Sequence, residues 1–194
     1  MIKRICVFCG ALPGKNPLYR EAAVALGEKL VECGIELVYG GGKVGLMGVV
    51  ADAVLHAGGH VIGVIPEALL AKELGHKGIS DLRVVKSMHE RKALMSDLSD
   101  AFIALPGGFG TLDELFEVVT WLQLGAHDKP SGLLNIGGYY DHMLKFLDHV
   151  SAEGFLTVED RQILLVDNDP GSLIEGLRSF VPRVATKWVA ISQT

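Results

Sequence analysis

Ala-Phe-Ile-Ala-Leu-Pro-Gly-Gly-Phe-Gly-Thr-Leu-Asp-Glu-Leu-Phe-Glu, residues 101–117, is the stretch that decides the fold of this chain. Its first five residues form a short, continuous apolar run, which is typical of a strand buried on both faces, and Pro106 ends the run. Three glycines then let a ligand approach the backbone without interference from a Cβ atom: Gly107, Gly108 and Gly110. Beyond Thr111, four apolar residues recur at helical spacing: Leu112, Leu115, Phe116 and Val119. The stretch therefore predicts a strand, a glycine turn and a helix that begins at Thr111.

This order of elements favours the binding of an anion at the turn. The first amides of a helix lack intrahelical acceptors, and the helix dipole is positive at that end. Glu114 lies one turn inside the predicted helix and adds a carboxylate. Thr111-x-x-Glu114 also matches a capping box, in which the threonine accepts from a helix amide and the glutamate bonds back. The local sequence favours the cap over a functional role for Glu114, although three glycines are more than a cap needs.

Length, composition and net charge limit the classes of protein to which this chain can belong. A chain of 194 residues with 49% hydrophobic content is long enough for one α/β domain with a core and short for two. The net charge of −5 argues against a broad basic surface for nucleic acid. No apolar run approaches the ~20 residues that span a bilayer. We therefore expect neither a nucleic acid nor a membrane as a partner.

The cysteines and histidines do not form a metal-binding pattern. Cys6 and Cys9 are three residues apart on a predicted strand, so their side chains point to opposite faces and do not easily converge on a metal. The seven histidines include no H-E-x-x-H motif. An odd count of three cysteines suits a reducing compartment, and we expect a cytoplasmic protein without a metal site.

Strand-like and helix-like segments alternate along the chain. The predicted strands are residues 2–8, 35–39, 60–65, 101–105, 131–135 and 162–166, with a short strand at 84–85 in the less regular segment 67–85. The predicted helices are residues 17–33, a helix that follows the glycine run at 40–48 and ends at about 57, then 88–98, from 111 onward, 139–150 and 172–180. Because strands that alternate with helices need crossover connections, we expect a doubly wound parallel sheet of the α/β class, in a single domain over residues 1–194.

Three loops follow strands directly and should meet at one edge of that sheet. Doubly wound sheets bind ligands at the carboxyl ends of their strands, near the point where the strand order reverses. The glycine clusters at residues 40–48 and 107–110 lie at this edge, as does the loop at residues 9–14. We expect the functional site there.

The first glycine cluster also matches a dinucleotide fingerprint. Gly40, Gly42 and Gly45 satisfy G-x-G-x-x-G between a strand and a helix, and Glu67 lies roughly where the acid that binds the ribose would fall. The fingerprint normally follows the first strand of its unit, whereas here a strand and a helix precede it. A dinucleotide site would also leave the second glycine turn unexplained, so an NAD-dependent oxidoreductase is a less favoured alternative. The absence of Gly-Lys-Ser/Thr excludes a P-loop.

The segment Ser87-Met88-His89-Glu90-Arg91-Lys92 opens the helix before the central strand. Taken alone, it is typical of a solvated charged turn. In a functional interpretation, Arg91 offers a planar fork for phosphate or for a polarised leaving group, and Lys92 offers a compact charge.

Taken together, four segments are similar to one family. Pro106-Gly-Gly-Phe-Gly-Thr-Leu-Asp-Glu114 matches the signature P-G-G-x-G-T-x-x-E of the LOG proteins, the cytokinin riboside 5′-monophosphate phosphoribohydrolases, which are often mislabelled lysine decarboxylases. The resemblance extends over roughly residues 5–135 and includes three further segments: residues 38–48, 88–92 and 16–19. It implies a Rossmann-like homodimer that cleaves the N-glycosidic bond of a nucleoside 5′-monophosphate, either AMP or an N6-modified AMP, to the free base and ribose 5-phosphate.

The family pattern also implies roles for individual residues. Arg91 and Glu114 carry catalysis in this pattern, so Glu114 is expected to serve both as helix cap and as catalytic carboxylate. The implied substrate contacts are Glu73, Arg91, Lys92, Gly107, Gly108, Phe109, Gly110, Thr111, Leu112, Asp113, Glu114, Thr120, Gly41 and Gly42. The first loop departs from the pattern, because Ala11 and Leu12 stand where family members usually have serines.

The chemistry of this reaction suits the two catalytic candidates. Breaking a ribosyl C–N bond passes through an oxocarbenium-like centre, as glycoside hydrolysis does. An ionised Glu114 would stabilise that centre and orient or deprotonate a water molecule. Arg91 would hold either the base or the phosphate, and the sequence leaves this choice open.

Two alternatives to this hydrolase concern other classes of protein. One is a nucleotide-binding carrier without turnover on the same fold, and the other is the NAD-dependent oxidoreductase. A pyridoxal phosphate decarboxylase would need a Schiff-base lysine and an acidic partner for the ring nitrogen. Lys92 beside Arg91 is poorly suited to that role, and we expect an enzyme without a cofactor.

Overall fold

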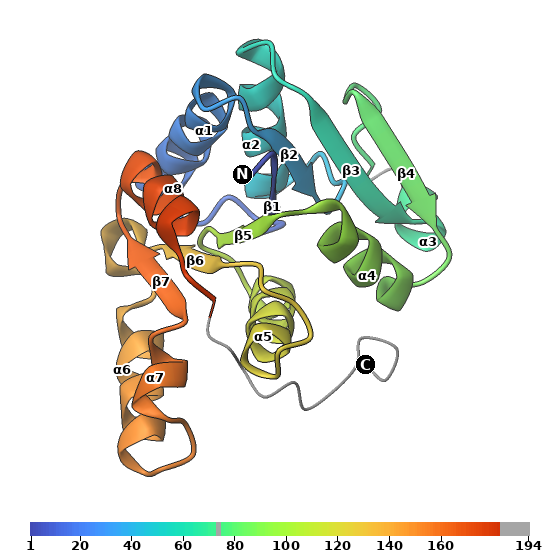
Figure 1. The fold of residues 1–194 in the computed structure, drawn as a ribbon. Helices are drawn as coiled ribbons and strands as arrows, with labels where there is room; N and C mark the ends of the chain where they lie inside the picture. Colours follow the sequence, from blue (N-terminus) through green and yellow to red (C-terminus); the bar gives the residue numbers. More distant parts are fainter. Residues whose placement is uncertain (73–74, 183–194) are drawn as a thin grey trace.

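A seven-stranded parallel sheet forms the centre of the molecule (Figure 1). The computed structural model describes residues 1–72 and 75–182. The strands are β1 (Arg4–Phe8), β2 (Glu36–Tyr39), β3 (Val61–Pro66), β4 (Asp81–Val85), β5 (Ala101–Ala104), β6 (Ser131–Leu134) and β7 (Leu164–Asp167). Their order across the sheet is β4-β3-β2-β1-β5-β6-β7, and each neighbouring pair is parallel. The parallel α/β sheet that the alternation predicts is confirmed.

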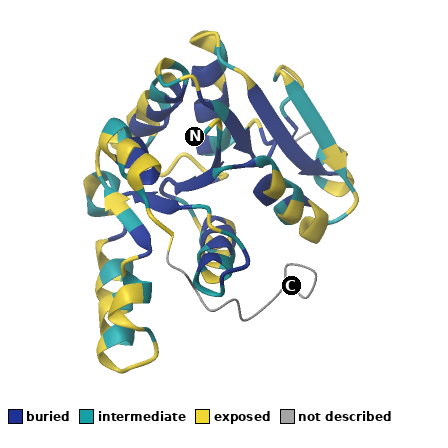
Figure 2. Ribbon diagram, in the orientation of Figure 1, coloured by how far each residue is buried: buried dark blue, intermediate teal, exposed yellow. Residues whose placement is uncertain are grey.

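Helices cover both faces of this sheet. They are α1 (Pro17–Glu32), α2 (Gly45–His56), α3 (Glu67–Leu70), α4 (Met88–Leu98), α5 (Phe109–Gln123), α6 (Asp141–Ala152), α7 (Val158–Arg161) and α8 (Pro170–Ser179), and a 3-10 turn, η1 (Ile136–Gly138), precedes α6. One hydrophobic core joins the sheet to α1, α2 and α8, and a second joins the opposite face to α4, α5 and α6. In Figure 2 the central strands are buried, whereas α6 and α7 are largely exposed. The fold is therefore doubly wound, as expected.

Local sequence explains most element boundaries to within three residues. At the start of α1, the Asn16 side chain accepts a hydrogen bond from the Leu18 amide at 3.1 Å, and Pro17 occupies the first helical position, where its missing N–H is no loss. The short elements α3, α7 and η1 were not expected from the periodicity, because three or four residues are too few to show a repeat.

The strand β4 is longer than the two residues expected at 84–85. It lies at the edge of the sheet, and none of its five residues is fully buried. Asp81 and Arg83 form an ion pair on it at 3.0 Å. Charged, half-exposed residues are usual on edge strands and hide the apolar pattern from which a strand is predicted.

The strand order reverses between β1 and β5. From β1, the chain builds the sheet outward through β2, β3 and β4, and then returns to place β5 on the other side of β1. Asp100 directly precedes β5 and links it to the start of β1, because its carboxylate accepts hydrogen bonds from the amides of Lys3 and Arg4 at 2.7 and 2.9 Å. The loops that follow β1 and β5 lead to α1 and α5 on opposite faces, so a crevice opens between them at the carboxyl edge.

Cys6 and Cys9 point to opposite faces of the sheet, as predicted. Cys6 belongs to the core beneath α4 and α5, and Cys9 belongs to the core beneath α1 and α2. Within residues 1–72 and 75–182, no group of three His, Cys, Asp or Glu side chains forms a potential metal site. In the same residues, no helix combines the length and hydropathy needed to cross a membrane.

Candidate active site

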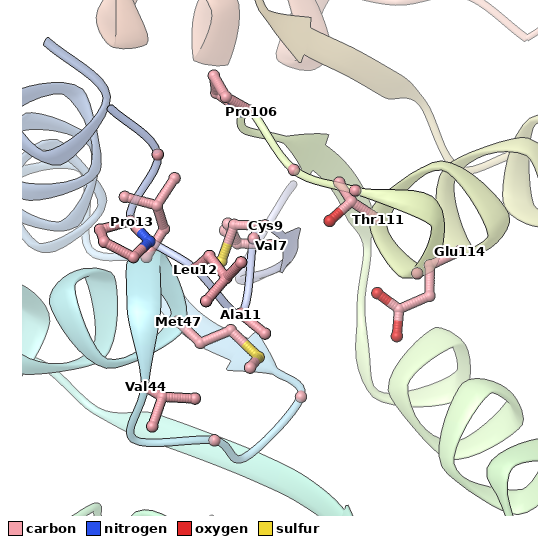
Figure 3. A pocket seen from close by; sticks show the side chains of 18 of the residues that line it. Val7, Cys9, Ala11, Leu12, Pro13, Val44, Met47, Pro106, Thr111 and Glu114 are labelled. Carbon is pink, nitrogen blue, oxygen red and sulfur yellow. The ribbon is translucent and has the colours of Figure 1, made fainter. Parts of the chain in front are cut away.

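A cavity of about 590 Å³ lies at the carboxyl edge of the sheet, where the strand order reverses. Its walls come from the loops after β1, β2, β5 and β6, together with α4 and α5. Figure 3 shows the loop from Cys9 to Pro13 on one side of the open space and Thr111 and Glu114 of α5 on the other. The volume lies within the ~300–1,000 Å³ of typical small-molecule pockets.

The glycine turn leads from β5 into α5 along one wall of this cavity. α5 begins at Phe109, two residues earlier than expected, and Gly108 precedes it in an extended conformation without a side-chain cap. Thr111 is therefore in the first helical turn rather than at the cap, and the predicted capping box with Glu114 is wrong. The early start leaves the first amides of α5 without a side-chain acceptor at a wall of the cavity.

The turn also requires a glycine at position 107. A Cβ atom there would lie 2.1 Å from the Thr111 hydroxyl oxygen and 2.9 Å from the Gly10 amide nitrogen. Both distances are far below van der Waals contact, so a larger residue would displace the turn.

A capping box does occur one helix earlier, at the start of α4. The Ser87 hydroxyl accepts the Glu90 amide at 3.1 Å, and the Glu90 carboxylate accepts the Lys86 amide at 2.8 Å. These bonds determine where α4 begins and put Arg91 in its first turn. The charged segment at residues 87–92 is thus both a helix cap and the support of a buried arginine.

Arg91 and Glu114 meet inside the cavity. The Arg91 Nη1 atom lies 3.1 Å from Glu114 Oε1, and each residue is less than a tenth exposed. Arg91 also donates from Nε to the carbonyl of Val64, near the carboxyl end of β3, at 3.2 Å. The guanidinium passes so close to Gly40 that a Cβ there would lie 2.0 Å from Nη2. A strand end, a glycine and a carboxylate therefore hold the guanidinium in one place.

The electrostatics of the pair have opposing causes. Burial raises the pKa of Glu114, and the Arg91 guanidinium is the main opposing influence. At a given acidic pH Glu114 is therefore protonated to a larger extent than an exposed glutamate, while Arg91 favours its ionised form. A shifted carboxyl group in a cavity is a feature of many catalytic sites.

Seven residues of the predicted site line the cavity. They are Arg91, Glu114, Thr111, Gly107, Gly108, Gly110 and Gly42. They come from α4, α5 and the loops after β5 and β2, which the strand order brings to one edge. The expectation that both glycine clusters meet at the carboxyl edge is confirmed.

The other predicted contacts do not line the cavity of this chain. Lys92 is turned toward α5, where its Nζ atom lies 2.9 Å from Glu117 and 3.3 Å from Asp113, and the hydrogen bond to Glu117 raises its pKa. The remaining residues in this group are Gly41, Phe109, Leu112, Asp113 and Thr120. Phe109 is 94% exposed. Glu73 lies outside the described residues.

The first glycine cluster has contacts that a dinucleotide does not explain. Gly40 leaves room for the guanidinium of Arg91, and Gly42 forms a β-bridge with Gly75. The carbonyl of Gly41 accepts a hydrogen bond from the amide of His76 at 2.9 Å. The φ angle of Gly41 is 71°, which is in the left-handed region. Gly40 and Gly42 of the G-x-G-x-x-G pattern therefore reflect close packing of Arg91 and of the segment around residue 75, and Gly45 reflects close packing of Ala11, because a Cβ there would lie 2.3 Å from the Ala11 carbonyl carbon.

Sequence reasoning placed the loop at residues 9–14 at this edge but did not single out several other residues that line the cavity. Tyr139 follows β6 and comes from the same edge of the sheet; its hydroxyl donates to the carbonyl of Gly107 at 2.5 Å. Tyr19 contacts it edge to face, with ring centroids 5.5 Å apart. Apolar walls come from the first loop, β3, α2 and α3, through Leu12, Pro13, Ile65, Met47 and Leu69. The signal that identifies Tyr139 is its position just beyond a predicted strand.

A family model and curated relatives match this chain. The model described as "Possible lysine decarboxylase" matches residues 47–177. A cytokinin riboside 5′-monophosphate phosphoribohydrolase of Arabidopsis thaliana, LOG3, is 52% identical over 188 residues, which cover 95% of this chain and 87% of that protein. The chain belongs to the LOG family.

Other LOG proteins have similar identities. A probable cytokinin riboside 5′-monophosphate phosphoribohydrolase of Oryza sativa subsp. japonica, LOGL9, is 53% identical over 180 residues, which cover 93% of this chain and 79% of that protein. LOG7 of Arabidopsis thaliana is also 53% identical over 180 residues, with 93% and 83% covered. The resemblance drawn from the glycine turn and its neighbouring segments is confirmed.

Solved structures share the fold of this LOG protein at lower identity. A molybdenum cofactor binding protein from Rippkaea orientalis superposes with a TM-score of 0.70 at 22% identity, covering 92% of this chain and 97% of that one. The molybdenum cofactor carrier protein of Chlamydomonas reinhardtii has a TM-score of 0.67 at 22% identity, covering 92% and 97%. These similarities establish the common Rossmann-like fold alone.

The residues of the cavity do not fit the cofactor that the family description suggests. A pyridoxal phosphate decarboxylase needs a lysine amine that is neutral often enough to form a Schiff base. None of the residues that line the cavity in the described part of the chain is a lysine. Lys92, the nearest candidate in the sequence, is paired with two carboxylates that favour its charged form.

Proposed function

We propose that this protein hydrolyses the N-glycosidic bond of nucleoside 5′-monophosphates, AMP or an N6-modified AMP such as a cytokinin riboside monophosphate. The products are the free base and ribose 5-phosphate. One observation carries the proposal: the buried ion pair of Arg91 and Glu114 lies in the same cavity as the uncapped glycine turn of α5. The names of the relatives that are about half identical support the same reaction.

The glycine turn binds the 5′-phosphate in this proposal. Gly108, Gly110 and Thr111 line the cavity at the start of α5, where amides without intrahelical acceptors and the positive end of the helix dipole favour an anion. Binding there holds the ribose near Glu114, which is one turn further along the helix. Positioning of this kind supplies several kcal/mol of barrier reduction in many enzymes, roughly 7 at the lower end of the effective-molarity estimates.

Glu114 acts on the reacting carbon in two ways. Its ionised carboxylate stabilises the positive charge that develops on the ribose as the C–N bond breaks. It also accepts a proton from the attacking water, which joins the sugar carbon while the base departs with the bonding electron pair. The base takes up a proton from solvent, and Glu114 returns the proton of the water to solvent, so that no net proton is consumed. Arg91 holds the carboxylate in place at 3.1 Å and presents the rest of its guanidinium to the cavity.

The apolar walls are suited to a base with an alkyl substituent. Met47, Leu69 and Leu12 line the cavity together with the aromatic rings of Tyr19 and Tyr139. Flat and apolar surfaces of this kind bind purine rings and N6-alkyl groups by burying them from water. The proposal therefore includes N6-modified adenine nucleotides among the substrates.

A panel of nucleoside 5′-monophosphates tests this function. The purified protein is incubated with AMP, N6-isopentenyl-AMP, CMP and the nucleoside adenosine, and free base is measured by chromatography. Release of base from at least one monophosphate, without release from adenosine, is the expected result. Binding of the nucleotides without base release would support the carrier alternative, and NAD reduction would support an oxidoreductase.

Lysine is included in the same panel to test the family description. We expect no cadaverine or carbon dioxide from lysine in the presence of added pyridoxal phosphate, because the cavity lacks a lysine among its described residues. Release of either product at a rate comparable with base release would contradict the proposal.

The proposal includes a homodimer. The outer face of α5 and the start of α4 expose large apolar side chains: Phe109 at 94%, Met88 at 45% and Phe116 at 36%. Exposed apolar residues grouped in this way are typical of a surface that another chain covers. Light scattering coupled to size exclusion should give twice the mass of 20.8 kDa, and Phe109→Ser with Phe116→Ser should shift it toward the monomer.

A further inference from the structure

Three successive carbonyl groups at the glycine turn accept hydrogen bonds from residues outside the turn. The bonds are Tyr140 Oη to the Leu105 carbonyl at 2.6 Å, the Gly10 amide to the Pro106 carbonyl at 3.1 Å, and Tyr139 Oη to the Gly107 carbonyl at 2.5 Å. A backbone so rich in glycine has many accessible conformations, and these bonds select one of them. All three acceptors are engaged in that conformation.

We propose that Tyr139 and Tyr140 are positioning residues: they hold the backbone of the glycine turn in the conformation that binds the 5′-phosphate, and Tyr139 orients the Gly108 amide. This inference rests on the proposed function, because it concerns how that site binds its substrate. Neither tyrosine reacts with the substrate. Each acts through the backbone carbonyl to which it donates.

The planarity of the peptide bond links the anchored carbonyl of Gly107 to the amide of Gly108. In a trans peptide the carbonyl oxygen of one residue and the N–H of the next point in opposite directions. The bond from Tyr139 to the Gly107 carbonyl therefore sets the direction of the Gly108 N–H, and Gly108 lines the cavity. If this peptide rotated by half a turn, its carbonyl and N–H would exchange positions, and the carbonyl would repel an anion bound at the N–H.

Tyr140 acts at the start of the turn. The residue after Leu105 is Pro106, which has no N–H, so the bond from Tyr140 orients no amide directly. It holds the last carbonyl before the turn, in a place where Leu105 is fully buried and Tyr140 is 2% exposed. Burial raises the pKa of Tyr140, so its hydroxyl keeps the proton that it donates.

The loop after β6 is built to bring both tyrosines to this position. β6 is the neighbour of β5, and Gly137 and Gly138 follow it with φ angles of 60° and 70°, which turn the chain back toward the glycine turn. The Asn135 side chain accepts the Tyr140 amide at 2.8 Å and donates to Asp141 at 2.8 Å. The neighbouring strand and the contacts of this loop therefore determine the placement of the hydroxyls.

Tyr139 is held on both sides although it is 41% exposed. Its ring lies edge to face against Tyr140, with centroids 4.8 Å apart, and against Tyr19 at 5.5 Å. Phenylalanine at position 139 would keep both ring contacts and lose only the hydroxyl. Tyr139→Phe is thus the variant that separates the hydrogen bond from the packing.

The test compares a ligand that carries the phosphate with one that does not. Binding of ribose 5-phosphate and of adenosine is measured by calorimetry, so that no turnover is involved. Tyr139→Phe should raise the Kd of ribose 5-phosphate about tenfold, which corresponds to 1.4 kcal/mol, and change the Kd of adenosine less than twofold. In the AMP assay the same variant should raise KM more than it lowers kcat.

Tyr140→Phe and Tyr39→Phe complete the design. Tyr140→Phe removes the donor to a buried carbonyl, so it should lower the melting temperature as well as the affinity for ribose 5-phosphate. Tyr39→Phe is the matched control, because Tyr39 is buried outside the lining of the cavity and its hydroxyl has no hydrogen-bond partner among the described residues. It should leave both affinities unchanged.

The possible outcomes separate this inference from the proposed function. Equal weakening of adenosine and ribose 5-phosphate by Tyr139→Phe, or no weakening of either, would overturn the positioning role while hydrolysis of AMP by the wild-type protein still stood. A wild-type protein that binds neither compound and releases no base from the nucleotide panel would overturn the proposed function, and the positioning role with it.

Discussion

Arg91 and Glu114 form an ion pair of 3.1 Å that is nine-tenths buried. The two residues come from different helices, α4 and α5, which precede and follow β5 in the sequence. Buried pairs of this kind contribute little net stability, because the loss of hydration offsets much of the attraction. Their retention in a cavity therefore points to a use other than stability.

Glu114→Gln should abolish base release while the fold and nucleotide binding remain. Glutamine has nearly the same shape and can still hydrogen-bond to Arg91, but it has no charge to stabilise an oxocarbenium-like centre and cannot deprotonate water. We expect kcat to fall by at least 10²-fold, the lower range for the loss of a general base. Chromatography of free base measures the effect, and circular dichroism checks the fold. Turnover near the wild-type rate in a folded variant would contradict the role of Glu114.

The activity should rise with pH through the pKa of Glu114. Burial raises this pKa above its ordinary value of 4.5, and the ionised carboxylate is the active form, so the acidic limb of the kcat profile should lie above pH 4.5. Replacing Arg91 by Met removes the main influence that lowers the pKa, so the limb of any residual activity should move to higher pH. A limb that moves to lower pH, or does not move, would show that another group titrates.

The titration of Glu114 should also make the stability of the protein depend on pH. Activity should rise with pH through the pKa of Glu114, whereas the free energy of unfolding should fall. A pKa that is higher in the folded state means that the folded state binds the proton more tightly, so the contribution is full below pH 4.5 and is lost as pH rises through the folded pKa. Relative to Glu114→Gln, the wild-type free energy of unfolding should therefore decrease with rising pH across this window. Urea unfolding of both proteins between pH 4 and pH 8 measures the difference.

Gly40→Ala should disable the site through Arg91. The new Cβ would lie 2.0 Å from Arg91 Nη2, and Gly40 does not have a left-handed φ, so the backbone itself tolerates alanine. The displaced guanidinium should lower kcat/KM for AMP on the order of 100-fold, as misplacement of a catalytic group by about 1 Å does elsewhere. Gly176→Ala on α8 is the control: its Cβ would have ordinary contact at 3.7 Å from Leu165 and should leave activity unchanged. Equal activity of the two variants would contradict the constraint at Gly40.

The three thiols should differ in reactivity. Cys6 is fully buried and Cys9 is 7% exposed, and burial raises the pKa of both thiols, so both remain protonated and shielded at pH 8. Cys33 is partly exposed. Titration with a chromogenic disulfide should therefore modify one thiol rapidly in the native protein and three in urea, and Cys33→Ser should remove the rapid phase. A second rapid thiol in the native protein would contradict the burial of Cys9 beside the cavity.

Much of the fold could be predicted because the strands and the helices each have their own hydrophobic pattern in the sequence. Continuous apolar runs such as residues 101–105 are required by strands buried on both faces, and their alternation with helices admits few arrangements other than a doubly wound sheet. The edge strand β4 lacks this signal because its charged residues face solvent. The predicted start of α5 was wrong because the helix begins after Gly108, whose extended backbone replaces a side-chain cap. No pattern of side chains in the sequence indicates that backbone conformation.

The site was predicted in part because its signature lies on a single helix. A motif read along the chain includes residues on every side of α5, whereas only Thr111 and Glu114 of that helix, with Gly110, reach the cavity. Phe109, Asp113 and Thr120 lie on its outer face and are exposed. The position of Tyr139 just beyond a predicted strand placed it at the carboxyl edge, but its contact with Gly107 could not be predicted, because that contact depends on β6 being the neighbour of β5.

The hydrogen bond between the Gly10 amide and the Pro106 carbonyl has a consequence for synthesis of the chain. Its two residues are about one hundred positions apart, so the first loop and the glycine turn meet only after half of the protein has been made. Until β5 emerges, β1 has an unpaired hydrogen-bonding edge in the middle of what becomes the sheet. We expect nascent chains that stop before residue 101 to associate with chaperones or with one another, and the catalytic pocket to be absent from every such intermediate.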